Sequence, residues 1–394
     1  MRLPRLPELD GLRALLAWWV VFYHAHGVTF SNAFLIERGP FAFLSHGSLA
    51  VDVFMILSGF VIWLLLDRER ESYGVFVLRR FLRLFPIYAV CLAVMIPLQP
   101  LFIANLRAHA ATIEPELFER MLFAAEQPLR DLGAQLAWHV PMLHGMVPET
   151  WLHNAAGAFL TPAWSISLEW QFYLIAPLAF ALTRRGAWGM AAWGAITVVA
   201  FATRRLWPPF GFDAFLPLRL HLFTVGMASY YGLRWAFSLD PKPRWLVRAP
   251  AAAITATFAF VVLQSIRHGL ANGTTPAGWF PLAIWGVVLG VLVARWAGSR
   301  SGAVDAAQRV LTWPPLVRLG AASYSTYLAH WPVLVLCQAA FRTLLRDPAP
   351  WPLLALHLAI SLPIVALLSI ALHRTVEQPG IALGRRLAAR LRAA

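Results

Sequence analysis

The sequence predicts an all-α polytopic membrane protein, and two observations lead to that fold class. Hydrophobic residues make up 59% of the 394 residues and charged residues only 13%. Soluble proteins average about 45–50% apolar and about 25% charged residues, so a soluble fold of this size could not bury so much apolar surface. In addition, apolar runs of the length that a helix needs to cross a bilayer, about 20 residues, recur along the whole chain.

Ten of these runs are long and apolar enough to be predicted as transmembrane helices. They lie at residues 12–29, 47–66, 84–105, 164–183, 186–203, 216–236, 249–266, 278–297, 319–341 and 351–373. No second soluble domain, low-complexity linker or internal repeat interrupts them. A single membrane domain over residues 1–394 is therefore predicted.

Charge indicates the orientation of these helices, because cytoplasmic loops carry an excess of Lys and Arg. If the N-terminus is cytoplasmic, 23 of the 33 basic residues fall on the cytoplasmic side, including those of a basic tail at 374–394. This predicts that both termini are cytoplasmic. The net charge of +14 is spread between apolar runs rather than gathered in one patch, so nucleic acid is not a predicted partner.

The one long outer segment, 106–163, contains a semi-apolar piece from Leu132 to Met146. This piece is short and interrupted by Pro141, so it is predicted to be re-entrant or to lie in the membrane interface. The segment also holds three histidines without the spacing of a metal-binding motif, His139, His144 and His153. No metal site is predicted, and these histidines are interpreted as interfacial or substrate-side polar groups.

Arg13 and His24 in the first apolar run are the leading candidate site residues. Ionisable groups inside a membrane helix are costly and usually face a partner or a cavity. The two residues are eleven positions apart, which places them on nearly the same helix face and about 16 Å apart along the axis. A neutral histidine can act as general base near neutral pH. A structural histidine bonded to a neighbouring helix is the alternative, and Asp52, Glu169 and His330 are possible neighbours.

Arg80 and Arg83 precede the third apolar run and share one helix face. Two guanidinium groups can bind phosphate oxygens in a bidentate manner, which predicts an anion site on the cytoplasmic side. Anchoring to lipid headgroups is the alternative interpretation.

Several motifs occur along the chain in a characteristic order. They are Leu9-Asp10-Gly11-Leu12-Arg13 with His24, Val51-Asp52-Val53-Phe54 with Leu57-Ser58-Gly59-Phe60, Arg80-x-x-Arg83, Trp164-Ser165-Ile166-Ser167-Leu168-Glu169 with Gln171-Phe172-Tyr173, Ser323-Tyr324-Ser325 with His330-Trp331-Pro332, and Glu377-x-Pro379. In these motifs the whole chain resembles the bacterial integral-membrane acyltransferase-3 family, which includes O-antigen and exopolysaccharide O-acetylases.

The resemblance implies about ten spans, cytoplasmic acyl-CoA (acetyl-CoA above all) as donor, and a hydroxyl of a cell-surface glycan or similar molecule as acceptor. Arg13 and His24 match the family's essential arginine and histidine, and Arg80 and Arg83 match its basic pair. Asp52 and Glu169 are further candidates for the catalytic group, with a structural or orienting role as the favoured interpretation. The substrate and donor are also expected to contact four residues: Trp164, Ser165, Tyr324 and His330. The chain departs from the family where Trp170 follows Glu169, because many members have a second acidic residue there.

With this resemblance, the sequence predicts a multi-pass O-acyltransferase in the lipid bilayer of a bacterial inner membrane, which moves an acetyl or similar short acyl group from CoA to a sugar hydroxyl. A transporter or flippase for a glycan or glycolipid is the main alternative, since intramembrane Arg and His also suit an anionic substrate path. A structural subunit of an envelope complex is a third reading. Release of free CoA thiol that depends on both donor and acceptor discriminates the enzyme from the other two.

Overall fold

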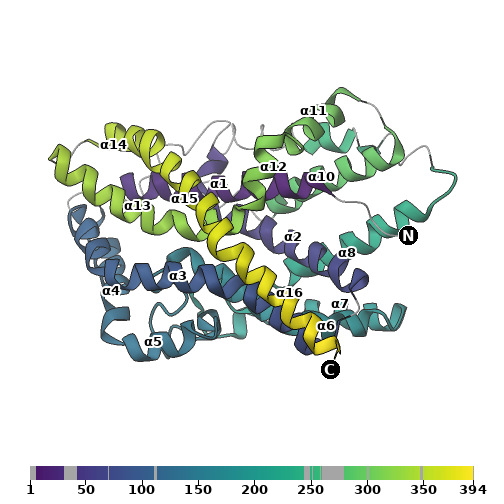
Figure 1. Ribbon diagram of the computed structural model, residues 1–394, viewed down its shortest axis with the longest axis horizontal. Helices are drawn as coiled ribbons and strands as arrows, with labels where there is room; N and C mark the ends of the chain where they lie inside the picture. The colour runs from purple at the N-terminus through teal and green to yellow at the C-terminus, as the bar shows by residue number, and fades with distance from the viewer. Residues whose placement is uncertain are drawn as a thin grey trace. The chain divides into compact units, whose positions relative to one another are not determined.

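The structure is a computed structural model, and it describes residues 6–30, 42–69, 71–110, 113–243, 249–250, 252–257, 259, 279–299, 301–346 and 349–393. Within these residues the chain is helical and contains no strand, apart from an isolated antiparallel bridge between Pro148 and Phe210 (Figure 1). The α-helices are α1 Pro7–Phe30, α2 Gly47–Arg68, α3 Tyr73–Arg107, α4 Pro115–Arg130, α5 Leu132–His139, α6 Trp164–Thr183, α7 Ala187–Ala202, α8 Leu216–Ser238, α10 Trp279–Ala297, α11 Gly302–Leu311, α12 Pro314–Ala321, α13 Ser323–Leu345, α14 Pro350–Leu356, α15 Leu362–Leu372 and α16 Gln378–Ala393.

Six helical segments of the described chain are long and apolar enough to cross a membrane. They are Gly47–Arg68, Tyr73–Arg107, Thr161–Thr183, Trp279–Ala297, Ser323–Leu345 and Pro350–Arg392. The helix α7 is apolar but shorter, and α1 and α8 are long enough but carry more polar side chains, such as Arg13, His24 and Arg219. The predicted span at 249–266 lies largely outside the described residues.

The nine other predicted spans coincide with described helices, and the main differences lie at their ends. The third helix begins at Tyr73 rather than at residue 84, because its basic entry segment continues as helix with buried Val75 and Phe76 on one face. The last helical segment extends far beyond residue 373 through a π-helical turn, His373–Glu377, into α16. The predicted 374–394 tail is thus helical to Ala393.

The piece from Leu132 to Met146 does not form one helix. Its helix α5 has 8 residues and is followed by a short 3-10 turn at His144–Met146. A helix of that length rises only about 12 Å, well short of the roughly 30 Å of bilayer hydrocarbon. The helix α5 is therefore too short to cross the bilayer, as the sequence predicted for this piece.

The chain forms two compact units. The first contains residues 1–23, 34–68 and 222–323, and the second contains 24–33, 69–221 and 324–394. In the first unit, glycines allow close helix approach: a Cβ on Gly59 of α2 would lie 2.2 Å from the carbonyl oxygen of Phe223 in α8. A Cβ on Gly226 of α8 would lie 2.0 Å from the Ile56 carbonyl oxygen. These two helices therefore pack with almost no side-chain spacer between their backbones.

In the second unit, α3 packs against α4 through a buried apolar cluster that includes Ile103, Leu106 and Ala125. The C-terminal helix α16 lies along α3 (Figure 1), with Gly380 so close that its Cβ would come within 2.6 Å of the Leu82 carbonyl oxygen. The α3 helix thus has neighbours towards both of its ends, and it carries the basic pair predicted from the sequence.

Candidate functional site

His24 and His330 lie side by side in the second unit. The Nδ1 atom of His24 is 2.9 Å from Nε2 of His330, and the two rings stack with 5.0 Å between their centres and an angle of 20°. His330 is fully buried on α13, and Trp331 packs edge-on against His24 at 5.2 Å. The structure therefore joins two residues that are 306 positions apart in the sequence, as the prediction of His330 as a possible neighbour anticipated.

The backbone fixes which nitrogens carry protons in this pair. Nδ1 of His330 is 3.2 Å from the carbonyl oxygen of Thr326, and a carbonyl can only accept, so Nδ1 of His330 is the donor. In a neutral ring Nε2 of His330 is then an acceptor, which makes Nδ1 of His24 the donor between the two rings. When the His24 ring is neutral as well, its Nε2 atom is the unprotonated nitrogen, the form that a general base requires.

A hydroxyl pair lies one helical turn before His330. The Tyr327 hydroxyl is 2.7 Å from Oγ of Ser165 and donates to the Pro162 carbonyl at 2.9 Å. The rings of Tyr327 and His330 have centres 6.1 Å apart. Ser165, at the start of α6, is thus linked through Tyr327 to the histidine pair.

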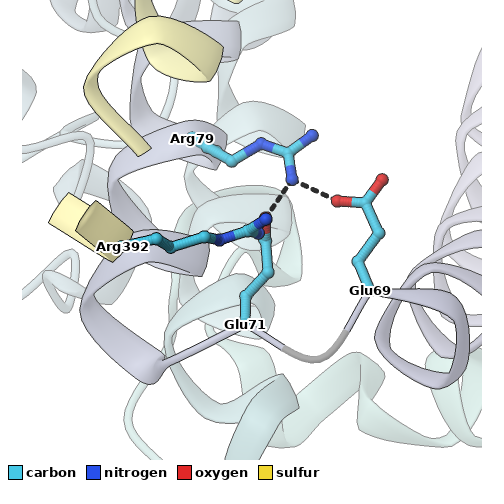
Figure 2. A network of polar contacts seen from close by, with 4 residues as sticks. All are labelled: Glu69, Glu71, Arg79 and Arg392. Carbon is cyan, nitrogen blue, oxygen red and sulfur yellow. Dashed lines mark hydrogen bonds and ion pairs between the residues drawn. The ribbon is translucent and has the colours of Figure 1, made fainter. Parts of the chain in front are cut away.

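The basic residues at the start of α3 fall into two groups. Arg79 donates to Glu69 and Glu71, and Glu71 also accepts from Arg392 of α16, which Figure 2 shows as one network. Arg79 is thus engaged in holding α16 against the start of α3. Arg80 differs, because its Nε atom is buried with no hydrogen-bond partner among the described residues. Such an orphaned donor is expensive in a protein interior unless something outside the described chain accepts from it.

Arg83 lies one turn further along α3, near carboxylates. Its charge interacts with those of Glu377 and Glu169. Glu377 is 1% exposed and accepts from Oγ of Ser325 and from Nδ1 of His373, both at 2.8 Å. The π-helical turn that contains Glu377 places these groups together, and π turns inside helices are frequent at functional sites.

Two tyrosines complete this arginine–carboxylate cluster. Tyr173 donates to Glu169 within α6, and the Tyr324 hydroxyl donates to the Leu84 carbonyl of α3 at 2.7 Å. Tyr324 is therefore bonded to the backbone of α3, one residue beyond Arg83. The cluster brings together Arg80, Arg83, Glu169, Tyr173, Tyr324 and Glu377.

Two of the predicted catalytic residues, Arg13 and Asp52, belong to the first unit. Arg13 makes an ion pair with Asp10 at 2.9 Å on the same helix, and Asp52 is half-buried on α2. The predicted Trp164 is buried at the start of α6, where its ring stacks on Phe212. Among the described residues no group of three or more His, Cys, Asp or Glu is placed to hold a metal ion.

Sequence reasoning did not assign a site role to Tyr173, Tyr327 or Glu377. Glu377 had a signal, because it is an acidic residue at the end of the last apolar run and part of the Glu377-x-Pro379 motif. Tyr173 had a weaker one, four positions after Glu169 and therefore on the same helix face. Tyr327 had none, because its role depends on Ser165 of a distant helix.

Membrane-length helices with buried ionisable side chains define an integral membrane protein with a polar site, rather than one whose helices serve only as an anchor. Its family follows from comparison with known proteins. Residues 6–372 match the acyltransferase domain that defines the acyltransferase-3 family. The chain belongs to this family of membrane acyltransferases.

Individual relatives agree with the family assignment. The chain is 27% identical to acyltransferase MdmB of Streptomyces mycarofaciens, over 98% of this chain and 94% of that protein. It is 28% identical to the putative membrane-bound transacylase BcsY of Komagataeibacter xylinus, over 84% and 73%. It is 25% identical to O-acetyltransferase OatA of Staphylococcus aureus, over 84% of this chain but only 51% of OatA. No solved structure matches the chain.

Proposed function

We propose that the protein is a membrane O-acyltransferase that moves an acetyl or similar short acyl group from cytoplasmic acyl-CoA to a hydroxyl of a cell-surface glycan. Membership of the acyltransferase family supports the reaction type. The similarity to OatA, an O-acetyltransferase, supports acetyl transfer to oxygen.

The observation that carries this proposal is the histidine pair. His330, anchored on the Thr326 carbonyl, orients the His24 ring and leaves Nε2 of His24 able to take a proton. His24 is the proposed general base, and His330 is the proposed positioning residue. A base of this kind typically contributes about 10²–10⁴-fold to the rate.

The proposed reaction balances without a further reactant. Nε2 of His24 takes the proton of the acceptor hydroxyl while the acceptor oxygen attacks the thioester carbonyl carbon. A carbon–oxygen bond forms, the carbon–sulfur bond breaks, and the leaving thiolate of CoA takes the proton back from His24. The products are the acylated acceptor and free CoA.

The arginine–carboxylate cluster is the proposed donor-binding site. The orphaned Nε of Arg80 and the guanidinium of Arg83 suit the phosphate groups of acyl-CoA, which accept charge-assisted hydrogen bonds. The carboxylates of Glu169 and Glu377 would orient Arg83. Arg13 and Asp52 of the first unit are proposed to orient the donor and the catalytic group, as their place in the family motifs suggests.

Ten spans with both termini in the cytoplasm are part of the proposal. The distribution of basic residues supports this topology, as do the nine described helices at predicted spans. In this topology Arg80 and Arg83 lie in the cytoplasmic half of α3, on the side of a bacterial inner membrane from which a soluble donor arrives.

Purified protein in vesicles, supplied with labelled acetyl-CoA and a membrane glycan extract, tests the proposal. The comparison is wild type against His24→Ala, with His26→Ala as the matched control, since His26 is a buried histidine two positions along the same helix. We expect labelled glycan and free thiol with wild type and His26→Ala but not with His24→Ala. Transfer that persists in His24→Ala contradicts the base assignment, and no transfer by wild type to any acceptor favours a transporter or flippase.

A further inference from the structure

Backbone strain in the second unit is concentrated in one layer of loops. Six non-glycine residues of the described chain have positive φ, and five of them lie in the loop layer formed by residues 140–163 and 203–215: Met142, Asn154, Phe159, Phe212 and Asp213. The two segments are joined by a hydrogen bond from the Glu149 amide to the Pro209 carbonyl at 2.9 Å. Strained residues of this kind tend to gather at active and ligand-binding sites.

Two neighbouring residues of this layer, Phe212 and Asp213, both have positive φ, of 56° and 52°. Gln171 of α6 holds the following residues in place, since its side chain donates to the Ala214 carbonyl and accepts from the Leu216 amide, each at 2.9 Å. The surrounding structure therefore fixes this turn in a conformation that a phenylalanine rarely adopts.

The result of this turn is an aromatic ring that is held at the surface. Phe212 is 48% exposed and stacks on buried Trp164, with ring centres 5.8 Å apart and an angle of 10°. Arg219 braces the pair, because its guanidinium lies 5.2 Å from the Trp164 ring centre and donates to the Phe212 carbonyl at 3.3 Å. The carboxylate of Asp213, the next residue, belongs to a side chain that is 67% exposed, and it lies 3.7 Å from the Arg219 guanidinium, with which it forms an ion pair.

Residue contacts connect this surface to the histidine pair. Trp164, beneath Phe212, is followed directly by Ser165, which bonds Tyr327 at 2.7 Å. Tyr327 contacts His330, which bonds His24. The exposed ring is thus connected to the proposed base within the second unit, through side-chain contacts and the chain neighbours Trp164 and Ser165.

We infer that Phe212 and Asp213 form the binding platform for the sugar ring of the acceptor, an inference that rests on the proposed function. The C–H face of a pyranose is apolar and flat enough to lie on an aromatic ring, whose binding contribution is largest when it is held rigidly. The hydroxyl groups at the edge of the sugar donate to the carboxylate of Asp213. A ring that only anchors the protein in the lipid interface needs neither a strained backbone nor an adjacent carboxylate.

The test uses methyl glycosides of glucose, mannose and N-acetylglucosamine as probes. Their binding is measured by saturation-transfer NMR without donor, and their acetylation is measured with labelled acetyl-CoA. Phe212→Leu keeps an apolar side chain but removes the aromatic face, Phe212→Trp keeps the face, and Trp188→Leu on α7 removes another exposed aromatic ring. Thermal unfolding of each variant in detergent reports folding.

Phe212→Leu is expected to raise the dissociation constant and the KM of the glycosides by about tenfold, the upper range for one aromatic contact, with the KM for acetyl-CoA unchanged. Trp188→Leu is expected to stay near wild type, and Phe212→Trp is expected to lose less affinity than Phe212→Leu because it keeps an aromatic face. Unchanged glycoside affinity in Phe212→Leu, an equal loss in Trp188→Leu, or no glycoside binding by wild type overturns the inference. Glycoside binding that depends on Phe212, without any label transfer, supports the platform and contradicts the acyltransferase. Label transfer that is unchanged by substitutions of Phe212 supports the acyltransferase and contradicts the platform.

Discussion

Replacing His330 by leucine isolates the role of the histidine pair. Leucine retains much of the volume of the buried ring, but it cannot accept from Nδ1 of His24 or donate to the Thr326 carbonyl. The His24 ring then loses both its orientation and the partner that fixes its tautomer. Because His330 is proposed to act through His24, the change is expected to lower kcat rather than to weaken donor binding.

The magnitude follows from the two interactions that are lost. A neutral hydrogen bond contributes about 0.5–1.5 kcal/mol, and a partner that orients a functional histidine is typically worth about 10–100-fold. We therefore expect kcat to fall by about 10–100-fold in His330→Leu. In His330→Gln the loss is expected to be smaller, since an amide can both accept from His24 and donate to a carbonyl. The assay is CoA thiol release at saturating acetyl-CoA and acceptor, per folded protein.

His357→Leu is the matched control for this experiment. His357 is also fully buried in the second unit, but its nitrogens bond Gln338 and Ser361 at 2.8 and 2.9 Å. If both leucine variants lower the amount of folded protein but not its kcat, His330 has a structural role only. A wild-type kcat in His330→Leu, at equal folded amount, refutes the positioning argument.

Three further predictions concern stability, measured as thermal unfolding in detergent. Burial lowers the pKa of His144 to about 4. The neutral ring therefore contributes fully to the free energy of unfolding above pH 6.5, and this contribution is lost as the pH falls towards 4. We expect the protein to be about 2 kcal/mol less stable at pH 5 than at pH 7.5, and the difference to be smaller in His144→Gln. Gly59→Ala is expected to lower stability by about 1–3 kcal/mol through its 2.2 Å contact, whereas Gly232→Ala, with no atom within 4 Å, should leave it equal or higher. Glu71→Gln should destabilise more than Arg392→Gln, because the carboxylate is 2% exposed and the guanidinium 55%.

The helices were predictable because membrane spans leave a strong signal in one dimension. A run of about 20 apolar residues is visible without knowing its neighbours, and α6 has the predicted bounds of 164–183. The ends of helices that leave the apolar run were not predictable in this way. The first turns of α3 and α16 pack against each other, and this contact is not visible in either segment alone. The need for glycine at position 380, where a Cβ would meet the Leu82 carbonyl, follows only from the packed pair.

The candidate site was predictable as a set of residue types but not as a set of contacts. Costly intramembrane groups such as His24, Arg83 and Glu169 are visible in the sequence because they interrupt apolar runs. Which of them pair is decided by helix packing, so neither the His24–His330 bond nor the contact between Ser165 and Tyr327 could be derived from spacing.

The loop layer shows the limit of sequence reasoning most clearly. Asp is found at positive φ more often than most residues, but nothing in the sequence indicates positive φ at Phe212. The turn exists because Gln171 and Arg219 hold its backbone from other elements. The same physics gives such a site its value for binding. A ring held by a strained and braced backbone loses little freedom when a ligand stacks on it, so its affinity depends on the distant residues that hold it as much as on the ring itself.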